Sequence, residues 1–238
     1  MSDWFAGFAA DFSQTFIEAD RWKVLIKSLG VTLEITALAL IIGLLLGIIV
    51  AVIRSSHDQM AAQRRDNVLL SVLNSLCHLY LTIIRGTPVM VQLLIMYFVI
   101  MAGSTNTVLV ATLTFGVNSG AYVAEIIRSG IMSIDRGQME AGRSLGLNYV
   151  QTMWQIIIPQ AIKNILPALG NEFITLLKET SIVNVIGMRD ITKWAMNVQG
   201  RTYQAFMPFI GIAVIYLIMV IILSKLVSLL ERRLNPDA

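Results

Sequence analysis

The sequence EAGRSLG at residues 140–146 continues to Ile156, Ile158 and Pro159, and it lies between two strongly apolar segments. Its residues are mostly polar and favour a helix, whereas the neighbouring segments contain few charges. The rest of the chain is suited to a membrane, and this stretch is therefore expected to form a polar helix outside the apolar segments. Such an element is typical of a docking surface, and it predicts a partner.

The composition predicts an all-α integral membrane protein. Hydrophobic residues make up 56% of the 238 residues and charged residues only 14%, which excludes an ordinary soluble domain. A helix crosses a bilayer in about 20 apolar residues. Residues 35–53, 86–124 and 202–224 are uncharged over that length or more, so the lipid bilayer is the first expected partner.

Several other classes of function find no support. The net charge is +3 and no basic run is present, so nucleic acid is not an expected partner. The single Cys77 forms no internal disulfide, and no spaced metal-ligand set occurs. A glycine-rich phosphate loop ending in Gly-Lys-Ser/Thr is absent, and no nucleophile–base pair stands out. We therefore expect no catalytic residues, no metal and no cofactor in this chain.

We predict a bundle of five spans. Residues 67–84 sort into an apolar and a polar stripe, which favours a buried or interfacial helix, so we assign them to the leading part of the second span. Within the first span, Gly43 and Gly47 would let a second helix approach closely, although lipid-facing glycines would give the same spacing. The five spans are residues 24–53, 87–102, 107–127, 162–187 and 203–226.

The segments outside the spans set the expected orientation. Residues 1–23 carry aromatic residues four apart, which predicts a helix lying in the membrane interface, although a frayed leader is also compatible. A polar loop containing Arg54, Arg64 and Arg65 and the polar loop at 128–155 are placed inside, where basic residues then prevail. The N-terminus is thus outside and the tail, residues 231–238, cytoplasmic, with six crossings as an alternative. The aromatic residues spaced four apart in the segment 1–23 are Trp4, Phe8, Phe12 and Phe16.

Ionisable residues within spans are costly and are functional candidates by default. The sharpest case is Glu172, which has Asn171 beside it and Thr175 on the same helix face. Its carboxylate could bind an ammonium group of a ligand or form a structural pair. Arg85 precedes a Gly-Thr-Pro break in the helix, and such breaks line cavities in membrane proteins. Arg85 could meet a carboxylate or extend toward the headgroups. The ionisable residues of the spans are Glu34, Arg85, Glu125, Glu172, Lys178 and Glu179.

The quoted stretch resembles the EAA motif of ABC importer permeases. Glu140 and Ala141 open it, Gly146 follows five residues after Ala141, and Pro159 closes it. The chain departs from the family at Gly142, where a second alanine is usual, and at the isoleucine before the proline. Further motifs in the order of the polar amino acid permease subfamily are Arg85-Gly86-Thr87-Pro88 with Gln92, Ala121-Tyr122 with Glu125 and Arg128, Gly137-Gln138, Leu166-Pro167, Asn171 and Lys178-Glu179-Thr180-Ser181.

The resemblance implies a five-span helical bundle of the type I ABC importer permease kind, at residues 24–230, in the bacterial inner membrane. A cytoplasmic coupling helix within a loop of about 128–160 would contact an ATPase dimer that holds ATP and Mg. A second permease chain, either a copy or a relative, would pair with this one, and an extracytoplasmic binding protein would deliver a polar or charged amino acid. The implied coupling residues are Glu140, Ala141, Gly142, Gly146 and Pro159.

Substrate contacts are assigned to residues that match the subfamily or lie beside Glu172. A glutamate at position 172 would favour a ligand with positive charge or an exposed ammonium group. The set comprises Glu172, Asn171, Gln92, Tyr122 and Arg85.

Two readings from other classes remain as alternatives. The chain could be an autonomous ion-coupled carrier or channel, in which the carboxylates of the spans bind protons or sodium, or a membrane scaffold for a soluble partner. A docking helix between the third and fourth spans favours the importer subunit, because an autonomous carrier has no need of it.

Overall fold

The computed structural model describes residues 2–62 and 67–234, and every regular element in these two ranges is a helix. This confirms the prediction of an all-α chain. The α-helices are α1 (Ser2–Phe12), α2 (Arg21–Ala62), α3 (Val68–Gly86), α4 (Val89–Ile95), α5 (Thr107–Met132), α6 (Arg136–Ser144), α7 (Tyr149–Thr152), α8 (Ile158–Glu179), α9 (Ile191–Thr202) and α10 (Phe206–Leu234). Short π-helical segments are η1 (Ser13–Ile17), η3 (Met96–Ile100) and η4 (Met153–Ile157), and 3-10 segments are η2 (Glu18–Asp20) and η5 (Thr180–Ile186).

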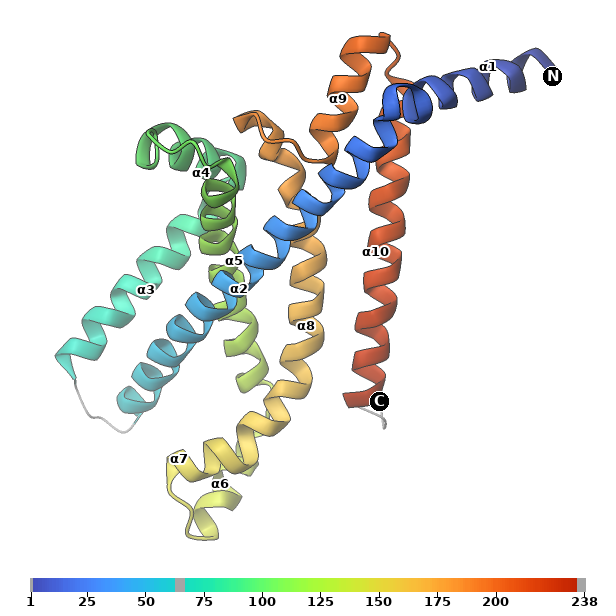
Figure 1. The fold of residues 1–238 in the computed structure, drawn as a ribbon. Helices are drawn as coiled ribbons and strands as arrows, with labels where there is room; N and C mark the ends of the chain where they lie inside the picture. The colour runs from blue at the N-terminus through green and yellow to red at the C-terminus, as the bar shows by residue number, and fades with distance from the viewer. Residues whose placement is uncertain (1, 63–66, 235–238) are drawn as a thin grey trace.

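The long helices form a bundle in which α8 lies between α5 and α10, while α2 crosses the others obliquely (Figure 1). By length and composition, four described helical stretches can cross a membrane: Ala6–Met60, which contains most of α2, and α3, α5 and α10. α8, with 22 residues, corresponds to the predicted span at 162–187. The N-terminal α1 and the end of α10 lie at opposite ends of the bundle (Figure 1).

The second span differs from the prediction. The segment at 67–84 forms most of α3, a separate helix of 19 residues that is long and apolar enough to cross a membrane. Thr87 and Pro88 are extended, and the apolar helix that follows, Val89–Ile100, is shorter than a crossing needs. Proline has no N–H to continue the ladder of α3 and disfavours helical backbone at the residue before it. The predicted crossing at 87–102 is therefore wrong, and α3 is the candidate in its place.

The helix α2 extends well beyond the predicted first span. It continues to Ala62, so Arg54, which was expected in a cytoplasmic loop, is instead a buried residue within a helix. That prediction failed because apolar residues end at position 53, while the helical backbone continues on the strength of packing and of the ion pair described below. Arg64 and Arg65 of the same predicted loop lie outside the described residues.

Glycines allow α2 and α5 to pack very closely. A Cβ atom added at Gly47 would lie 2.4 Å from Cγ1 of Val123 and 3.0 Å from the backbone nitrogen of Ala124. A Cβ atom at Gly43 would lie 3.0 Å from Cβ of Ser119. Backbones approach this closely only where one side chain is missing. The predicted role of the glycine pair is confirmed, and its partner is α5.

Buried apolar residues form two clusters on the flanks of this crossing. The first unites α2, α4, α5, α8 and η5, and the second joins α2 and α5 to α3. Burial in these clusters fixes the position of α5 relative to α2, α3, α4, α8 and η5. The first cluster includes Ile35, Leu93, Phe115, Leu176 and Val183, and the second consists of Val50, Cys77, Leu81, Ala121 and Ala124.

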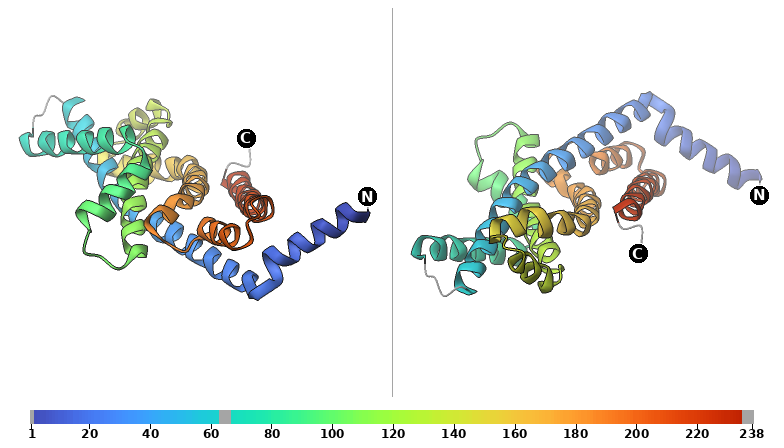
Figure 2. Two further views of the ribbon diagram at one scale, coloured as in Figure 1. Left: turned by 90° about the horizontal axis from the view of Figure 1, so that it is seen from above. Right: turned by 90° about the horizontal axis from the view of Figure 1, so that it is seen from below.

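Within the N-terminal segment predicted at 1–23, residues 2–20 form α1, η1 and η2, residues 21–23 begin α2, and α1 extends away from the other helices (Figure 2). Two of its aromatic rings are in contact, since the centroids of Phe12 and Phe16 are 4.9 Å apart. Phe16 also stacks on Trp194 of α9 at 5.6 Å, which ties the end of the segment to the bundle. The side chain of Trp4 lies outside the described part of the chain. The interfacial position of this helix stays a prediction.

The segment between the predicted spans at 162–187 and 203–226 contains a helix that the sequence did not predict, α9. Its N-cap is Asp190, whose carboxylate accepts hydrogen bonds from the backbone N–H groups of Thr192 at 3.0 Å and Lys193 at 2.9 Å. Asp190 is fully buried, and burial raises the pKa of its carboxyl group, although the backbone donors oppose that rise. The cap therefore fixes the start of α9 while the carboxylate faces inward.

Candidate functional site

An open cavity of about 440 Å³ lies between α5 and α8. Most of its lining residues recur every three or four positions along each helix, so one face of each helix contributes. Carboxylates, a phenol, hydroxyls and an amide converge there, which suits a polar solute. The lining residues are Tyr122, Glu125, Ile126, Ser129, Gly130 and Ser133 from α5 and Asn164, Ala168 and Glu172 from α8.

The carboxylate of Glu172 faces this cavity from α8. It is partly buried, and its Oε1 atom accepts a 2.7 Å hydrogen bond from the hydroxyl group of Ser119 on α5. None of the ion pairs formed by the described residues includes Glu172. Because a carboxylate within an apolar bundle is best stabilised by a cation, Glu172 retains the capacity to bind a positively charged group.

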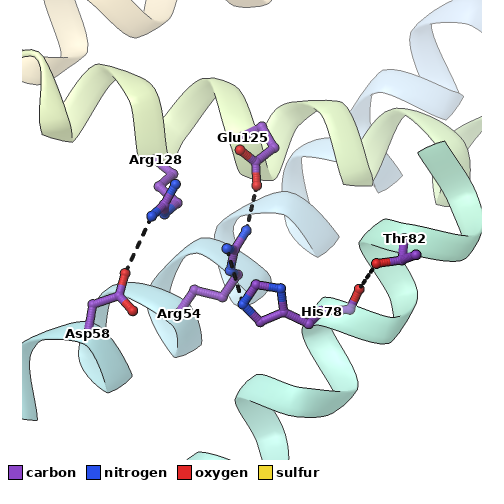
Figure 3. A network of polar contacts seen from close by, with 6 residues as sticks. All are labelled: Arg54, Asp58, His78, Thr82, Glu125 and Arg128. Atoms are coloured by element: carbon purple, nitrogen blue, oxygen red, sulfur yellow. Dashed lines mark hydrogen bonds and ion pairs between the residues drawn. The ribbon is translucent and has the colours of Figure 1, made fainter. Parts of the chain in front are cut away.

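Glu125, the second carboxylate of the cavity, is already neutralised. Its Oε1 atom accepts a 2.5 Å charge-assisted hydrogen bond from Nη1 of Arg54 on α2, and Nη2 of the same guanidinium lies 3.4 Å from Nε2 of His78 on α3 (Figure 3). One turn further along, Arg128 of α5 pairs with Asp58 of α2 at 3.7 Å. These contacts tie α5 to α2 and α3, and they leave Glu172 as the carboxylate of the cavity lining that has no ion-pair partner among the described residues.

Of the other predicted substrate residues, Tyr122 lines the cavity and Arg85 contacts Tyr122. The exposed guanidinium group of Arg85 lies over the Tyr122 ring, 5.7 Å from the centroid. The break after α3 is thereby placed beside the cavity, since Arg85 is in the last turn of that helix. A cation over an aromatic face is held by the ring quadrupole, so the pair forms a polar border of the cavity.

The structure does not bring the other two predicted residues into the cavity. Asn171 is exposed on α8 and is absent from the cavity lining. Gln92 holds the corner between α3 and α4, because its Nε2 atom donates to the carbonyl oxygen of Ile84 at 2.8 Å and to the hydroxyl of Thr87 at 2.9 Å. Its Oε1 atom accepts from Nδ2 of Asn118 on α5 at 3.0 Å. The Gln92 amide is thus engaged within the protein.

Sequence reasoning missed two residues of this site. Arg54 was assigned to a loop, although it lies seven positions after Gly47 and therefore on the same face of α2. That spacing could have identified it as a partner for a carboxylate on α5. Ser119 carried no comparable signal, because a single serine in an apolar helix is common and its contact with Glu172 joins residues 53 positions apart.

The stretch quoted first forms an element that projects from one end of the bundle, consisting of α6 and α7 (Figure 1). α6 begins at the N-cap Asp135, which accepts a 2.6 Å hydrogen bond from the N–H of Gly137. Gly142 is buried against Thr152, since a Cβ atom there would lie 2.5 Å from Cγ2 of Thr152. Gly146 has φ of +82°, a backbone conformation that glycine adopts without strain. Close packing and a tight turn therefore make α6–α7 one compact unit.

The outer surface of α6–α7 is chemically mixed. Glu140 and Ala141 are exposed on α6, and large apolar side chains are exposed nearby. Tyr149 is partly buried instead, and burial raises the pKa of its phenol, while the neighbouring charge of Arg143 opposes the rise. Exposed apolar groups among charged ones are typical of a surface that binds another protein. The exposed apolar side chains are Leu145 at 79%, Val150 at 61% and Trp154 at 68%.

Comparison with known proteins gives a consistent result. Residues 43–236 match the family described as binding-protein-dependent transport system inner membrane component. The chain is 37% identical to the arginine transport system permease protein ArtQ of Bacillus subtilis over 95% of this chain and 98% of that protein. It is 33% identical to the glutamine transport system permease protein GlnP of Escherichia coli K12, over 89% of this chain and 93% of that protein.

A solved structure is also similar over nearly the whole chain. It is the crystal structure of an amino acid ABC transporter with histidines, and its matching chain has a TM-score of 0.82 and 42% sequence identity. The match covers 92% of this chain and 98% of that chain.

Proposed function

The chain belongs to the family of binding-protein-dependent transport system inner membrane components, and from this premise we propose that it is the permease subunit of an ATP-driven amino acid importer. The observation that carries the proposal is the joint presence of an open cavity between α5 and α8, lined in part by polar side chains, and a compact element, α6–α7, that projects from the bundle. The cavity suits a solute, and the projecting element suits a partner protein.

We propose that the cargo is an amino acid whose positively charged group binds in the cavity. Glu172 supports this choice, because it lines the cavity and lacks an ion-pair partner among the described residues, whereas Glu125 is paired with Arg54. The named relatives transport arginine and glutamine, and both of these amino acids carry an α-ammonium group. Tyr122 and Arg85 would border the bound solute, and Arg85 could face its carboxylate.

The family implies an ATPase partner and a substrate-binding protein. We propose in addition that α6–α7 is the coupling element, that ATP and Mg bind only to the ATPase subunits, and that a second permease chain completes the translocation path. In this arrangement Glu140 and Ala141 would face the ATPase, while Gly142 and Gly146 keep the element compact. Pro159 lies in the first turn of α8, where it is well tolerated.

The proposed orientation follows from the position of this element. If α6–α7 contacts an ATPase, then it is cytoplasmic, and α1 and α9 lie toward the outside because they occupy the opposite end of the bundle (Figure 1). The relatives do not favour the alternative of an autonomous carrier, since they are named as permease proteins of transport systems.

Uptake by the reconstituted transporter tests the proposal. We expect the complex of this chain with its ATPase and binding protein to import a cationic amino acid into proteoliposomes only when ATP is supplied to the ATPase side. The Glu172→Gln variant should raise the apparent KM for a cationic amino acid by about tenfold or more, because one charge-assisted contact is lost. Glu34→Gln, which alters an exposed carboxylate of α2 away from the cavity, is the matched control. Uptake by the lone chain, or equal effects of the two variants, would contradict the proposal.

A further inference from the structure

Three arginines line one pocket at the end of the bundle opposite to α6–α7. The pocket has a volume of about 290 Å³ and lies between the start of α2, the segment before α9, and α9 itself. Figure 1 shows α9 and the start of α2 together at this end. The lining residues are Arg21, Val24, Arg189, Trp194, Asn197, Val198 and Arg201.

The charges of the three arginines are not compensated within the described residues. None of them takes part in an ion pair. The carboxylate next to Arg189 in sequence, Asp190, is fully buried and is engaged in capping α9. Asp20, next to Arg21, is paired with Lys23 at 2.8 Å. Three cations around one pocket repel one another, so an anion bound between them would be favoured.

Part of this cluster is fixed rather than freely mobile. Arg21 donates a hydrogen bond from Nη1 to the backbone oxygen of Gln14, and its backbone oxygen accepts a 3.0 Å hydrogen bond from Nε1 of Trp194. The Nε atom of Arg21 is buried and has no hydrogen-bond partner within the protein. A buried donor of this kind costs free energy unless a ligand or water satisfies it. The pocket therefore contains a positioned guanidinium with unused capacity.

The surroundings of the pocket indicate where its ligand comes from. Val24 and Trp22 are 53% and 45% exposed, and they lie at the start of α2, whose apolar residues continue into the candidate span. Arginine and tryptophan at the end of an apolar helix are typical of the headgroup level of a bilayer. An acidic side chain of a soluble partner would meet apolar surface here, whereas a lipid would place its acyl chains against it.

We propose that this pocket binds the phosphate of an anionic phospholipid from the leaflet at this end of the bundle. The guanidinium groups of Arg189 and Arg201 would contact the phosphate oxygens in the bidentate manner that the planar group allows. The acyl chains would lie along the exposed apolar surface of α2. This site is separate from the cavity of Glu172, and a bound lipid would link α2 to α9.

Titration of the purified full-length chain in detergent with dioctanoyl-phosphatidylglycerol tests the site. We expect the double variant Arg189→Gln/Arg201→Gln to bind this lipid about tenfold more weakly or worse, since each arginine near a lipid surface contributes roughly a factor of five. Lys193→Gln removes one positive charge from α9 but alters no residue of the pocket, and it should bind as the unmodified chain does. The variant Arg189→Lys/Arg201→Lys keeps the charge and should fall between the two.

Three outcomes would overturn the proposal. The first is unchanged lipid affinity in both double variants. The second is equal binding of dioctanoyl-phosphatidylcholine, or displacement of the lipid by inorganic phosphate at similar concentration, which would mean a non-selective or free-phosphate site. The third is that Arg189→Gln/Arg201→Gln binds the lipid normally but no longer docks the binding protein. That result would mean that the arginines bind acidic groups of the binding protein. Thermal unfolding of each variant checks that it is folded.

Discussion

Two regions of the molecule use the same packing device in opposite surroundings. At the crossing of α2 and α5, Gly47 lets the two backbones meet over Val123, and at the projecting element Gly142 lets α6 meet Thr152. The crossing lies among buried residues and is reinforced by the ion pair of Arg54. The element α6–α7 has its contact buried but most of its surface exposed.

In the arrangement that we propose, close packing serves stability at the crossing and transmission at the projecting element. Inside the bundle, a glycine contact fixes the position of α5, which carries one wall of the cavity. In the projecting element, it makes a compact unit that would, as the proposed coupling element, transfer a displacement to α8, which carries the other wall. Changes at the crossing should therefore alter folding, and changes at the element should alter communication with a partner.

Breaking the ion pair at the crossing should cause the largest loss of folding free energy. Arg54→Ala leaves the Glu125 carboxylate without its cation beside α2, so we expect the variant to lose about 3–5 kcal/mol of folding free energy. Thermal unfolding of the purified chain in detergent, together with the fraction that elutes as a single species, measures the loss. The double variant Arg54→Met/Glu125→Leu removes both charges and should recover most of the stability. If the double variant is no more stable than Arg54→Ala, the pair does not hold the crossing.

Disturbing the glycine contact at the crossing should cause the second largest loss of folding free energy. Gly47→Ala places a methyl group against both a side chain and a backbone nitrogen of α5, and the backbone has little room to yield. We expect a loss of about 1–3 kcal/mol, measured by the same unfolding experiment. Gly30→Ala on the same helix is the control, because no atom lies within 4 Å of its added Cβ. Alanine favours a helix over glycine, so this control should be neutral or stabilising, and equal losses would refute the packing account.

The sequence predicted the two regions to different degrees. Gly43 and Gly47 suggested a close approach because their spacing of four is a local property of a helix. The partner helix and the pairing of Arg54 with Glu125, 71 positions apart, depend on tertiary packing that no local pattern encodes. The break between α3 and α4 was predicted at Gly86-Thr87-Pro88, but the crossing was assigned to the wrong side of it, because the apolar stripe of residues 67–84 fits a crossing helix that packs on one side as well as it fits an interfacial one.

The candidate site was predicted in part for the same reason. Glu172 stood out because a carboxylate in an apolar stretch is unusual in any context, and Tyr122 lies with it in the cavity lining. Gln92 looked equally polar in the sequence, but its amide is engaged by Asn118 and Thr87. Whether a polar side chain is free or engaged depends on neighbours that only the fold brings together.

The glycine contact in the projecting element should have a smaller effect on stability and a larger one on communication. Gly142→Ala moves α6 away from Thr152, and we expect it to cost about 1 kcal/mol or less, because the gain in helix propensity offsets part of the strain. In the reconstituted complex, however, substrate should stimulate ATP hydrolysis less. Gly142→Ala/Thr152→Ala makes room for the methyl group and should restore that stimulation. Failure of the double variant to recover it would show that the contact has no part in coupling.

The smallest effect is expected at Glu140, and it separates the two regions most directly. Its side chain is exposed and forms no ion pair within the described residues, so Glu140→Gln should leave the folding free energy unchanged within about 0.5 kcal/mol. If Glu140 contacts the ATPase, the same change removes one exposed charge contact and should weaken the association by about 1 kcal/mol or less. A titration of the ATPase onto the purified chain measures this. Glu231→Gln, near the end of α10, alters a similarly exposed carboxylate and is the control. Equal affinities of the two variants would place the ATPase contact elsewhere, because only Glu140 belongs to the projecting element.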